Sequence, residues 1–181
     1  MICKKEVLLL IAYGNSLRRD DGAGLALAER LAEDWRTKGV QIRHLAVQQL
    51  APEMVVELSS LDLQSVIFVD TTANAAESIQ IKPATPTILG RVLGHHVTPG
   101  ALLLYVEHLY GQCPPAWLVT IPGVDFGFGE GFSTVAMQHL ATAEKVANAL
   151  LATVGYVPGS DDTENQTMPA GQEIRTLNIP S

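Results

Sequence analysis

Short, uninterrupted apolar runs alternate with helical patterns along most of this chain. Runs rich in Val, Leu and Ile are typical of parallel strands that are buried on both faces. Continuous runs occupy residues 7–12 and 66–69, a further predicted strand occupies residues 117–121, and an alternating run occupies residues 40–47. Helical patterns occupy residues 20–38, 52–60, 98–110 and 133–154. This order predicts an α/β fold, a three-layer α/β/α sandwich with a mostly parallel twisted central sheet.

Helix signals at the expected boundaries support this interpretation. Gly39 and Gly111 stand where the first and third helical patterns end, a position that favours glycine. Thr98 precedes Pro99, and Ser133 precedes the last helical pattern, so Thr98 and Ser133 are predicted N-caps. Between residues 72 and 94, two prolines predict extended pieces rather than a helix.

The chain is predicted to fold as one domain over residues 1–154. From residue 155 the composition becomes polar and acidic, with little to bury. Residues 155–181 are therefore expected to form a largely disordered C-terminal tail. The alternative is that the segment from Ile174 to Ile179 docks in an extended conformation.

Composition excludes several classes of partner. A formal net charge of −7 argues against nucleic-acid binding, which requires a basic face. The two cysteines, Cys3 and Cys113, have no metal-ligand spacing. The apolar run near the N-terminus is too short to span a membrane and is followed by no cleavage pattern. We expect a cytoplasmic monomer without membrane contact.

Two adjacent carboxylates lie where the first predicted strand leads into a helix. Asp20 and Asp21 belong to the segment 14–24, which is rich in glycine and polar residues. In open α/β sheets, ligands bind outside the carboxyl ends of the strands. The pair therefore indicates a functional site in preference to a surface turn.

A third carboxylate, Asp70, ends the predicted strand 66–69. A lone Asp in this position is often a turn residue or a helix cap. However, it occupies the same topological position as Asp21, and adjacent parallel strands would bring the two together. Two like charges at close range are unfavourable unless a proton or cation lies between them. The pair therefore favours a metal site.

Histidines complete the candidate site. His95 and His96 lie in a predicted loop before the helix that begins at Pro99. One imidazole with two carboxylates forms a mixed nitrogen and oxygen site, which suits Ni²⁺ or Zn²⁺ better than Mg²⁺. Spacing alone leaves open the alternative that both are exposed loop histidines.

Taken together, these blocks resemble the [NiFe] hydrogenase maturation endopeptidases. The resemblance covers roughly residues 6–150, and the order of the blocks makes it specific. It rests on Gly14-Asn15-x-Leu17-Arg18-x-Asp20-Asp21-Gly22-x-Gly24, Gln48–Glu53, Val69-Asp70, His95–Pro99, Leu102–Leu104, Ile121–Asp125 and Phe132-Ser133.

The resemblance implies a peptidase, aspartic-type or metal-dependent, that removes the C-terminal extension from the large-subunit precursor of a [NiFe] hydrogenase. Its implied ligands are Asp21, Asp70 and His95, with His96 as the rival to His95. The implied metal is nickel supplied by the precursor, which acts as the recognition signal, and Zn or Cd would substitute in the isolated protein. The chain departs from the family pattern in having Asp21 where well-known members have Glu.

Two loops are predicted to contact the substrate. Arg18 lies in the segment between the first strand and helix, and Asp125 and Phe126 lie in a Gly- and Phe-rich segment after the strand 117–121. The arginine would pair with carboxylates of the precursor, and the aromatic segment would grip its tail. The alternatives are a solvated turn for Arg18 and a connection whose Phe side chains cover the core.

Other function classes remain as alternatives. A non-enzymatic nickel-binding assembly factor would use the same groups without cleavage. A receiver-like, Mg-dependent phosphoacceptor domain also places acids after its first and third strands, but no Lys follows the strand 117–121. The segment 14–24 lacks the full glycine spacing of a dinucleotide-binding motif. No Ser/His/Asp or Cys/His nucleophile set and no His-Glu-x-x-His helix is present.

Overall fold

The computed structural model describes residues 6–73, 78–87, 97–156 and 177–180, and among these six strands form one sheet. The strands are β1 Val7–Tyr13, β2 Ile42–Val47, β3 Leu63–Thr72, β4 Ser78–Ala84, β5 Ala116–Pro122 and β6 Leu177–Pro180. The longer helices are α1 Ala23–Thr37, α3 Pro99–Tyr110, α4 Thr134–Leu140 and α5 Ala143–Thr153. Shorter turns of helix are η1 Arg19–Gly22, η2 Pro52–Met54 and α2 Val55–Leu58.

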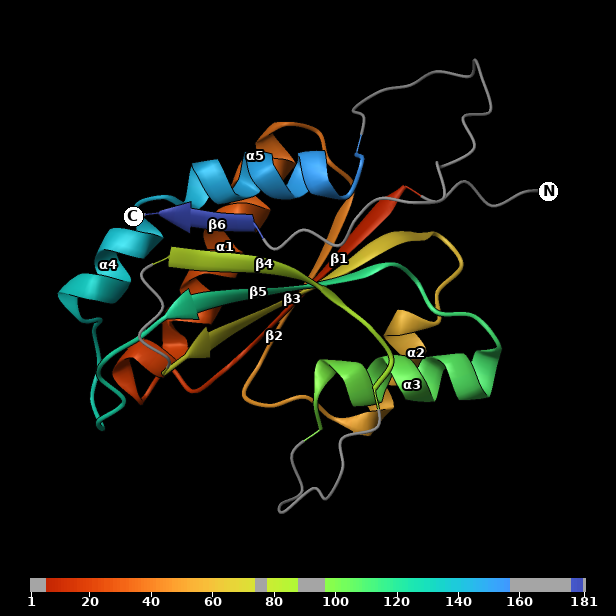
Figure 1. Cartoon of the computed structure of the whole chain (residues 1–181), viewed down its shortest axis with the longest axis horizontal. Coiled ribbons are helices and arrows are strands. Elements are labelled where there is room, and N and C mark those ends of the chain that lie inside the picture. Colours follow the sequence, from red (N-terminus) through yellow and green to blue (C-terminus); the bar gives the residue numbers. More distant parts are fainter. Residues whose placement is uncertain (1–5, 74–77, 88–96, 157–176, 181) are drawn as a thin grey trace.

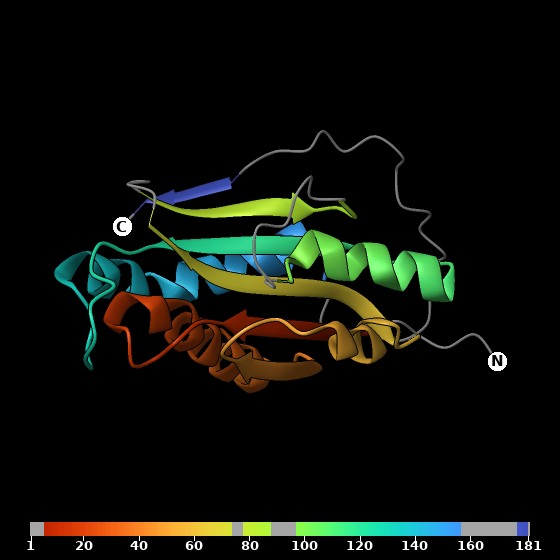
Figure 2. The same cartoon turned by 90° about the horizontal axis from the view of Figure 1, so that it is seen from below.

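The sheet is mixed but mostly parallel, as predicted. Its strand order is β2-β1-β3-β5-β4-β6, and the first four of these strands are parallel to one another. Strand β4 pairs antiparallel with both β5 and β6. Figure 2 shows the six strands stacked in this order, from β6 at the top to β2 at the bottom. Strands β1 and β3 are neighbours, so the carboxyl ends that carry the predicted acids lie side by side.

Helices cover both faces of the sheet, which confirms the three-layer architecture. Alternate residues of β1 divide between two cores because successive side chains of a strand point to opposite faces. Leu8, Leu10 and Ala12 pack with α1, α4 and α5, whereas Leu9 and Ile11 pack with α2 and α3. Figure 1 shows α5 above the strands and α2 with α3 below them.

The predicted helix boundaries are confirmed at three caps and corrected at two places. The Thr98 and Ser133 hydroxyls accept hydrogen bonds from the Ala101 and Ala136 N–H groups, and Gly111 ends α3 with φ 70°. The first predicted helix begins instead as the 3-10 turn η1, and α1 follows at Ala23. The last predicted helix is two helices, α4 and α5, which Ala141 and Thr142 separate.

The prediction of a disordered tail from residue 155 is wrong for the part that the structure describes. The Tyr156 hydroxyl accepts a hydrogen bond from the Gln41 N–H, and Tyr156 packs against the α1 side of the core. Further along, β6 adds to the sheet with Ile179 buried. This strand overlaps the segment Ile174 to Ile179, whose extended docking was the alternative to a tail. Residues 157–176 lie outside the described residues.

The extended pieces predicted between residues 72 and 94 are present where the structure describes them. Strand β4 includes Pro83 and runs antiparallel to β5, a direction that its composition did not reveal. In the described part of the chain, no helix has the length and apolar character needed to cross a membrane.

Candidate active site

A tight turn after β1 places Asp21 at the carboxyl edge of the sheet. Gly14 has φ 151°, and a Cβ at this position would lie 2.2 Å from the Asp21 carbonyl oxygen. Only glycine therefore fits this turn. The next residue, Asn15, donates its N–H to the Asp21 carboxylate over 3.0 Å. Asp21 is half-buried and keeps its second carboxylate oxygen outside this hydrogen bond.

Asp70 lies beside Tyr13. The two residues directly follow the last paired residues of β3 and β1. The register Ala12–Val69 puts these two residues next to each other, and the Tyr13 hydroxyl donates to the Asp70 carboxylate. The Thr71 N–H donates to the same carboxylate over 2.8 Å. Tyr13 is a site residue that the sequence reasoning missed. The sequence signal for Tyr13 was that it directly follows the predicted strand 7–12, just as Asp70 directly follows the predicted strand 66–69.

The pKa of Asp70 is raised to about 6. Burial is the main cause, and the negative charge of Asp21 adds to it. The hydrogen bonds from Tyr13 and Thr71 act in the opposite direction but do not cancel the rise. Burial and the Asp70 charge likewise raise the pKa of Tyr13. Asp21, in the η1 turn that follows β1, and Asp70, near the end of β3, thus interact, as their positions in the sequence predicted.

The first turn of α1 packs directly on the end of β3. A Cβ on Gly24 would lie 3.1 Å from the Asp70 carbonyl carbon, so a larger residue would push the helix and strand apart. The Gly24 N–H donates to the Thr71 hydroxyl over 2.9 Å. This close approach fixes Asp21 relative to Asp70.

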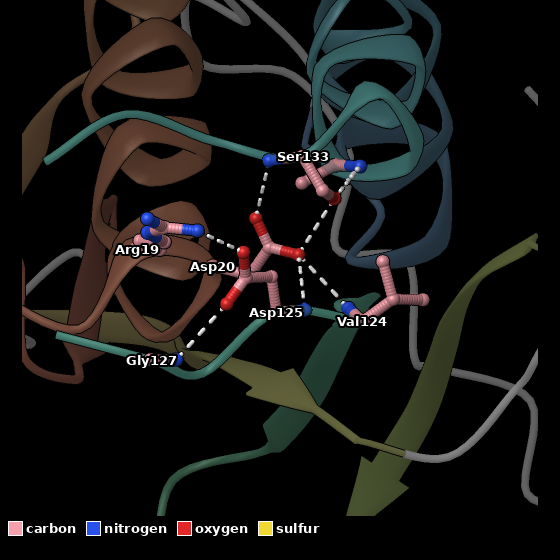
Figure 3. Close-up of polar contacts among 7 residues, drawn as sticks. Arg19, Asp20, Val124, Asp125, Gly127 and Ser133 are labelled. Carbon is pink, nitrogen blue, oxygen red and sulfur yellow. Dashed lines mark hydrogen bonds and ion pairs between the residues drawn. The ribbon is translucent and has the colours of Figure 1, made fainter. Parts of the chain in front are cut away.

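Asp20 takes a different role from the one predicted for it. Its side chain is fully buried, and its carboxylate accepts four hydrogen bonds from a loop more than 100 residues away, as Figure 3 shows. The donors are the N–H groups of Val124, Asp125 and Ser133 and the Ser133 hydroxyl, at 2.8, 3.0, 2.7 and 2.6 Å. Burial raises the pKa of Asp20, but these bonds together hold it below its ordinary value. The expected pair of adjacent site carboxylates is therefore corrected to Asp21 alone.

The three residues predicted to contact substrate lie together. Arg18 donates to the Phe126 carbonyl over 3.3 Å, and the neighbouring Arg19 forms an ion pair with Asp125. The Asp125 carboxylate also accepts the Gly127 N–H over 3.0 Å. A bridge between Arg18 and Gly129 joins the two loops further. Arg18, Asp125 and Phe126 thus hold the loop 123–133 against the turn that carries Asp21.

Phe126 and Phe128 of this loop differ in their surroundings. The sequence left open whether such Phe side chains cover the core or contact the substrate. A Cβ on Gly123 would lie 3.0 Å from the Phe126 ring, so Phe126 packs inward on the loop. Phe128 is 84% exposed and has no such packing role. Phe128 is therefore the better candidate for contact with another molecule.

The remaining predicted ligand, His95, lies outside the described residues, as does His96. Among the residues that the structure describes, no group of three His, Cys, Asp or Glu side chains is placed to hold a metal ion. His44 and His139 are largely buried elsewhere, in β2 and α4, and burial lowers the pKa of both. Asp21 and Asp70 interact electrostatically, and the ligand roles of these two residues and of His95 stay predictions.

Several solved structures similar to this chain are hydrogenase maturation proteases. HycI from Thermococcus kodakarensis KOD1 is 23% identical with a TM-score of 0.61, over 80% of this chain and 92% of that chain. The hydrogenase maturating endopeptidase HybD from E. coli is 17% identical with a TM-score of 0.60, over 82% and 93%. The endopeptidase HycI from E. coli is 20% identical with a TM-score of 0.55, over 78% and 90%.

These similarities establish the fold, which is that of the hydrogenase maturation proteases. No family model matches the sequence, and no curated protein matches it significantly. The antiparallel β4 and β6 also distinguish the sheet from the doubly wound order 2-1-3-4-5 of receiver-like domains. The phosphoacceptor alternative thereby loses its structural basis.

Proposed function

We propose that this chain is an endopeptidase that removes the C-terminal extension from the nickel-loaded large-subunit precursor of a [NiFe] hydrogenase. The observation that carries the proposal is the interacting pair Asp21 and Asp70, at adjacent strand ends in the fold of the maturation proteases. The resemblance of the sequence blocks to that family supports the same assignment.

Asp70 has the electrostatics that this function requires. A carboxyl group with a pKa of about 6 holds a proton at little free-energy cost near neutral pH and gives it up when a cation approaches. Nickel in the precursor would supply that positive charge. Asp21, Asp70 and His95 are the proposed ligands. Nickel arrives as part of the precursor, and Zn or Cd would substitute for it in the isolated protein.

The two acids also provide for the chemistry of peptide hydrolysis. A carboxylate that is not bound to the cation would act as the general base for the attacking water. A metal-polarised carbonyl or water would lower the demand on that base. The Asn15 N–H donates to the Asp21 carboxylate and fixes its orientation, which supports the proposed ligand role.

The test is incubation with nickel-loaded and nickel-free forms of the same precursor, with mass spectrometry of the products. We expect loss of the C-terminal extension from the loaded form alone. Binding of the loaded form without cleavage would instead support the assembly factor. Cleavage of both forms would contradict the recognition role of nickel.

Variants of the two histidines then identify the third ligand. His95→Ala is expected to abolish processing, and His96→Ala is the matched control that keeps the same loop composition. The reverse result would assign the role to His96. Retention of processing by both variants would remove the loop from the site.

A further inference from the structure

Strand β2 forms one edge of the sheet. It pairs in parallel with β1 from Ile42 to Val47, and no other described strand pairs with it. Figure 2 shows β2 as the outermost strand, at the bottom of the stack. Its other side is therefore available to a seventh strand.

The polar groups of that free side are defined by the ladder with β1. The Gln41 carbonyl accepts the Leu8 N–H over 2.9 Å, and the Val47 carbonyl accepts the Gly14 N–H over 3.2 Å. In a parallel strand, alternate residues direct both N–H and C=O to the same side. Ile42, His44 and Ala46 therefore direct their backbone donors and acceptors away from β1.

This edge lacks the features that usually prevent strand addition, whereas the opposite edge has them. Natural edges are blunted by short strands, prolines, bulges or unpaired charges. Strand β6 has four residues and ends at Pro180. Strand β2 has six residues, no proline and an unbroken register. Its charged residue Arg43 is paired with Asp62 over 2.5 Å.

The carboxyl end of β2 is continuous with the candidate site. The Gly14 N–H, bonded to the Val47 carbonyl, belongs to the turn whose next residue donates to the Asp21 carboxylate. A peptide that leaves Asp21 toward its own C-terminus and follows β2 runs antiparallel to it. Antiparallel addition to an exposed edge is a common mode of peptide recognition.

We propose that β2 binds the C-terminal extension of the substrate as an added antiparallel strand; this rests on the proposed endopeptidase function. The bound segment is extended and pairs with the outward N–H and C=O groups of Ile42, His44 and Ala46. Half-buried apolar side chains of Ile42, Leu45 and Val47 flank this edge, so apolar or β-branched residues of the extension fit it best. Ala46, small and exposed, leaves room for a large side chain near the site.

The first test removes one outward donor. Ala46→Pro eliminates an N–H that makes no bond to β1, and proline is tolerated on edge strands. We expect kcat/KM for the nickel-loaded precursor to fall about tenfold, mainly through KM, which corresponds to about 1.4 kcal/mol. The matched control is Leu177→Pro, at the start of the opposite edge strand β6, which is expected to keep the wild-type rate.

Hydrogen exchange provides a second measurement that does not depend on how well the proline variant folds. In a complex of the precursor with the Asp70→Asn chain, we expect slowed exchange at the amides of Ile42, His44 and Ala46. A precursor that lacks its extension should leave these amides unchanged. Equal exchange in both complexes, or self-association of the free chain through β2, would overturn the proposal.

Cleavage of the precursor by the wild-type chain distinguishes a failure of the endopeptidase function from a failure of strand addition to β2. If the wild-type chain leaves the nickel-loaded precursor intact, the proposed function fails. If it cleaves the precursor and Ala46→Pro cleaves it equally well while the β2 amides stay unprotected, only the strand-addition proposal fails.

Discussion

Asp20 and Asp70 lie at the same edge of the sheet, yet their surroundings shift the pKa values of the two carboxyl groups in opposite directions. Asp20 is fully buried and accepts four hydrogen bonds, which hold its pKa below the ordinary value despite burial. Asp70 accepts two, and burial, to which the negative charge of Asp21 adds, raises its pKa to about 6. Four hydrogen bonds offset the effect of burial on the pKa of Asp20, whereas two do not offset it for Asp70.

The comparison separates a structural role from a chemical one. The hydrogen bonds of Asp20 are all to groups of the chain itself, so its charge is used to join the η1 turn to the loop 123–133. Asp70 and Asp21 repel one another and have fewer internal donors, which fits the cation-binding role proposed for them. Groups that perturb one another in this way are characteristic of functional sites.

Neutralising Asp70 is expected to have the largest effect on activity. Asp70→Asn keeps the size of the side chain and an oxygen that accepts from Tyr13 or Thr71, so the fold should persist. We expect processing of the nickel-loaded precursor to fall at least about a hundredfold, measured as kcat/KM. Asp34→Asn, at the other end of α1, removes a surface carboxylate and is expected to leave the rate unchanged. Full activity in Asp70→Asn would remove Asp70 from the site.

Asp20 should show the converse pattern, with stability as the main effect. Asp20→Ala leaves the N–H groups of Val124, Asp125 and Ser133 without their acceptor, and we expect a loss of about 3 kcal/mol in the free energy of unfolding. Urea denaturation measures this loss. Ser133→Ala removes one of the four bonds and the cap of α4, so its expected cost is about 1 kcal/mol. Equal costs for the two variants would mean that Asp20 acts only through Ser133.

The dependence of stability on pH gives a smaller effect with a defined sign. Because folding raises the pKa of Asp70, the native state binds this proton more tightly, and its stabilising contribution is lost as pH rises from about 4 to about 6. Discounted for the solvent that reaches this half-buried group, the loss is about 1 to 2 kcal/mol.

Asp70→Asn should abolish that loss and be the more stable protein at pH 7. The difference between wild-type and variant unfolding free energies, measured at each pH, isolates Asp70 from the buried histidines, which titrate in the same range. A difference that stays flat between pH 4 and 7 would show that the Asp70 carboxyl has an ordinary pKa.

The sequence predicted the sheet and its carboxyl edge because those depend on local patterns. The continuous apolar run in β1 and the caps Thr98, Ser133 and Gly111 each act within a few residues, and each was interpreted correctly. The order of β1 and β3 followed from general rules for parallel sheets. The segment of β6 was raised only as the alternative to a disordered tail, because its order depends on a ladder with β4 and pairing partners cannot be deduced from polarity.

For the site, the sequence predicted residue types and positions but not the hydrogen-bond partner of each carboxylate. Asp20 and Asp21 are adjacent and chemically identical, so their separation into an internal anchor and a site carboxylate depended on the loop 123–133. Tyr13 was missed because a partner for Asp70 is visible only once the register of β1 and β3 is known.

The ion pair between Arg19 and Asp125 should contribute least, although it joins the same two loops as Asp20. Both side chains are more than a third exposed, so water and salt screen the pair. Arg19 also has φ 45°, a left-handed conformation that favours residues other than arginine. We expect Arg19→Ala to change the free energy of unfolding by less than about 1 kcal/mol and to lose even that effect in high salt. A loss as large as that of Asp20→Ala would show that the exposed ion pair holds the loop, and the contrast between buried and exposed carboxylates would fail.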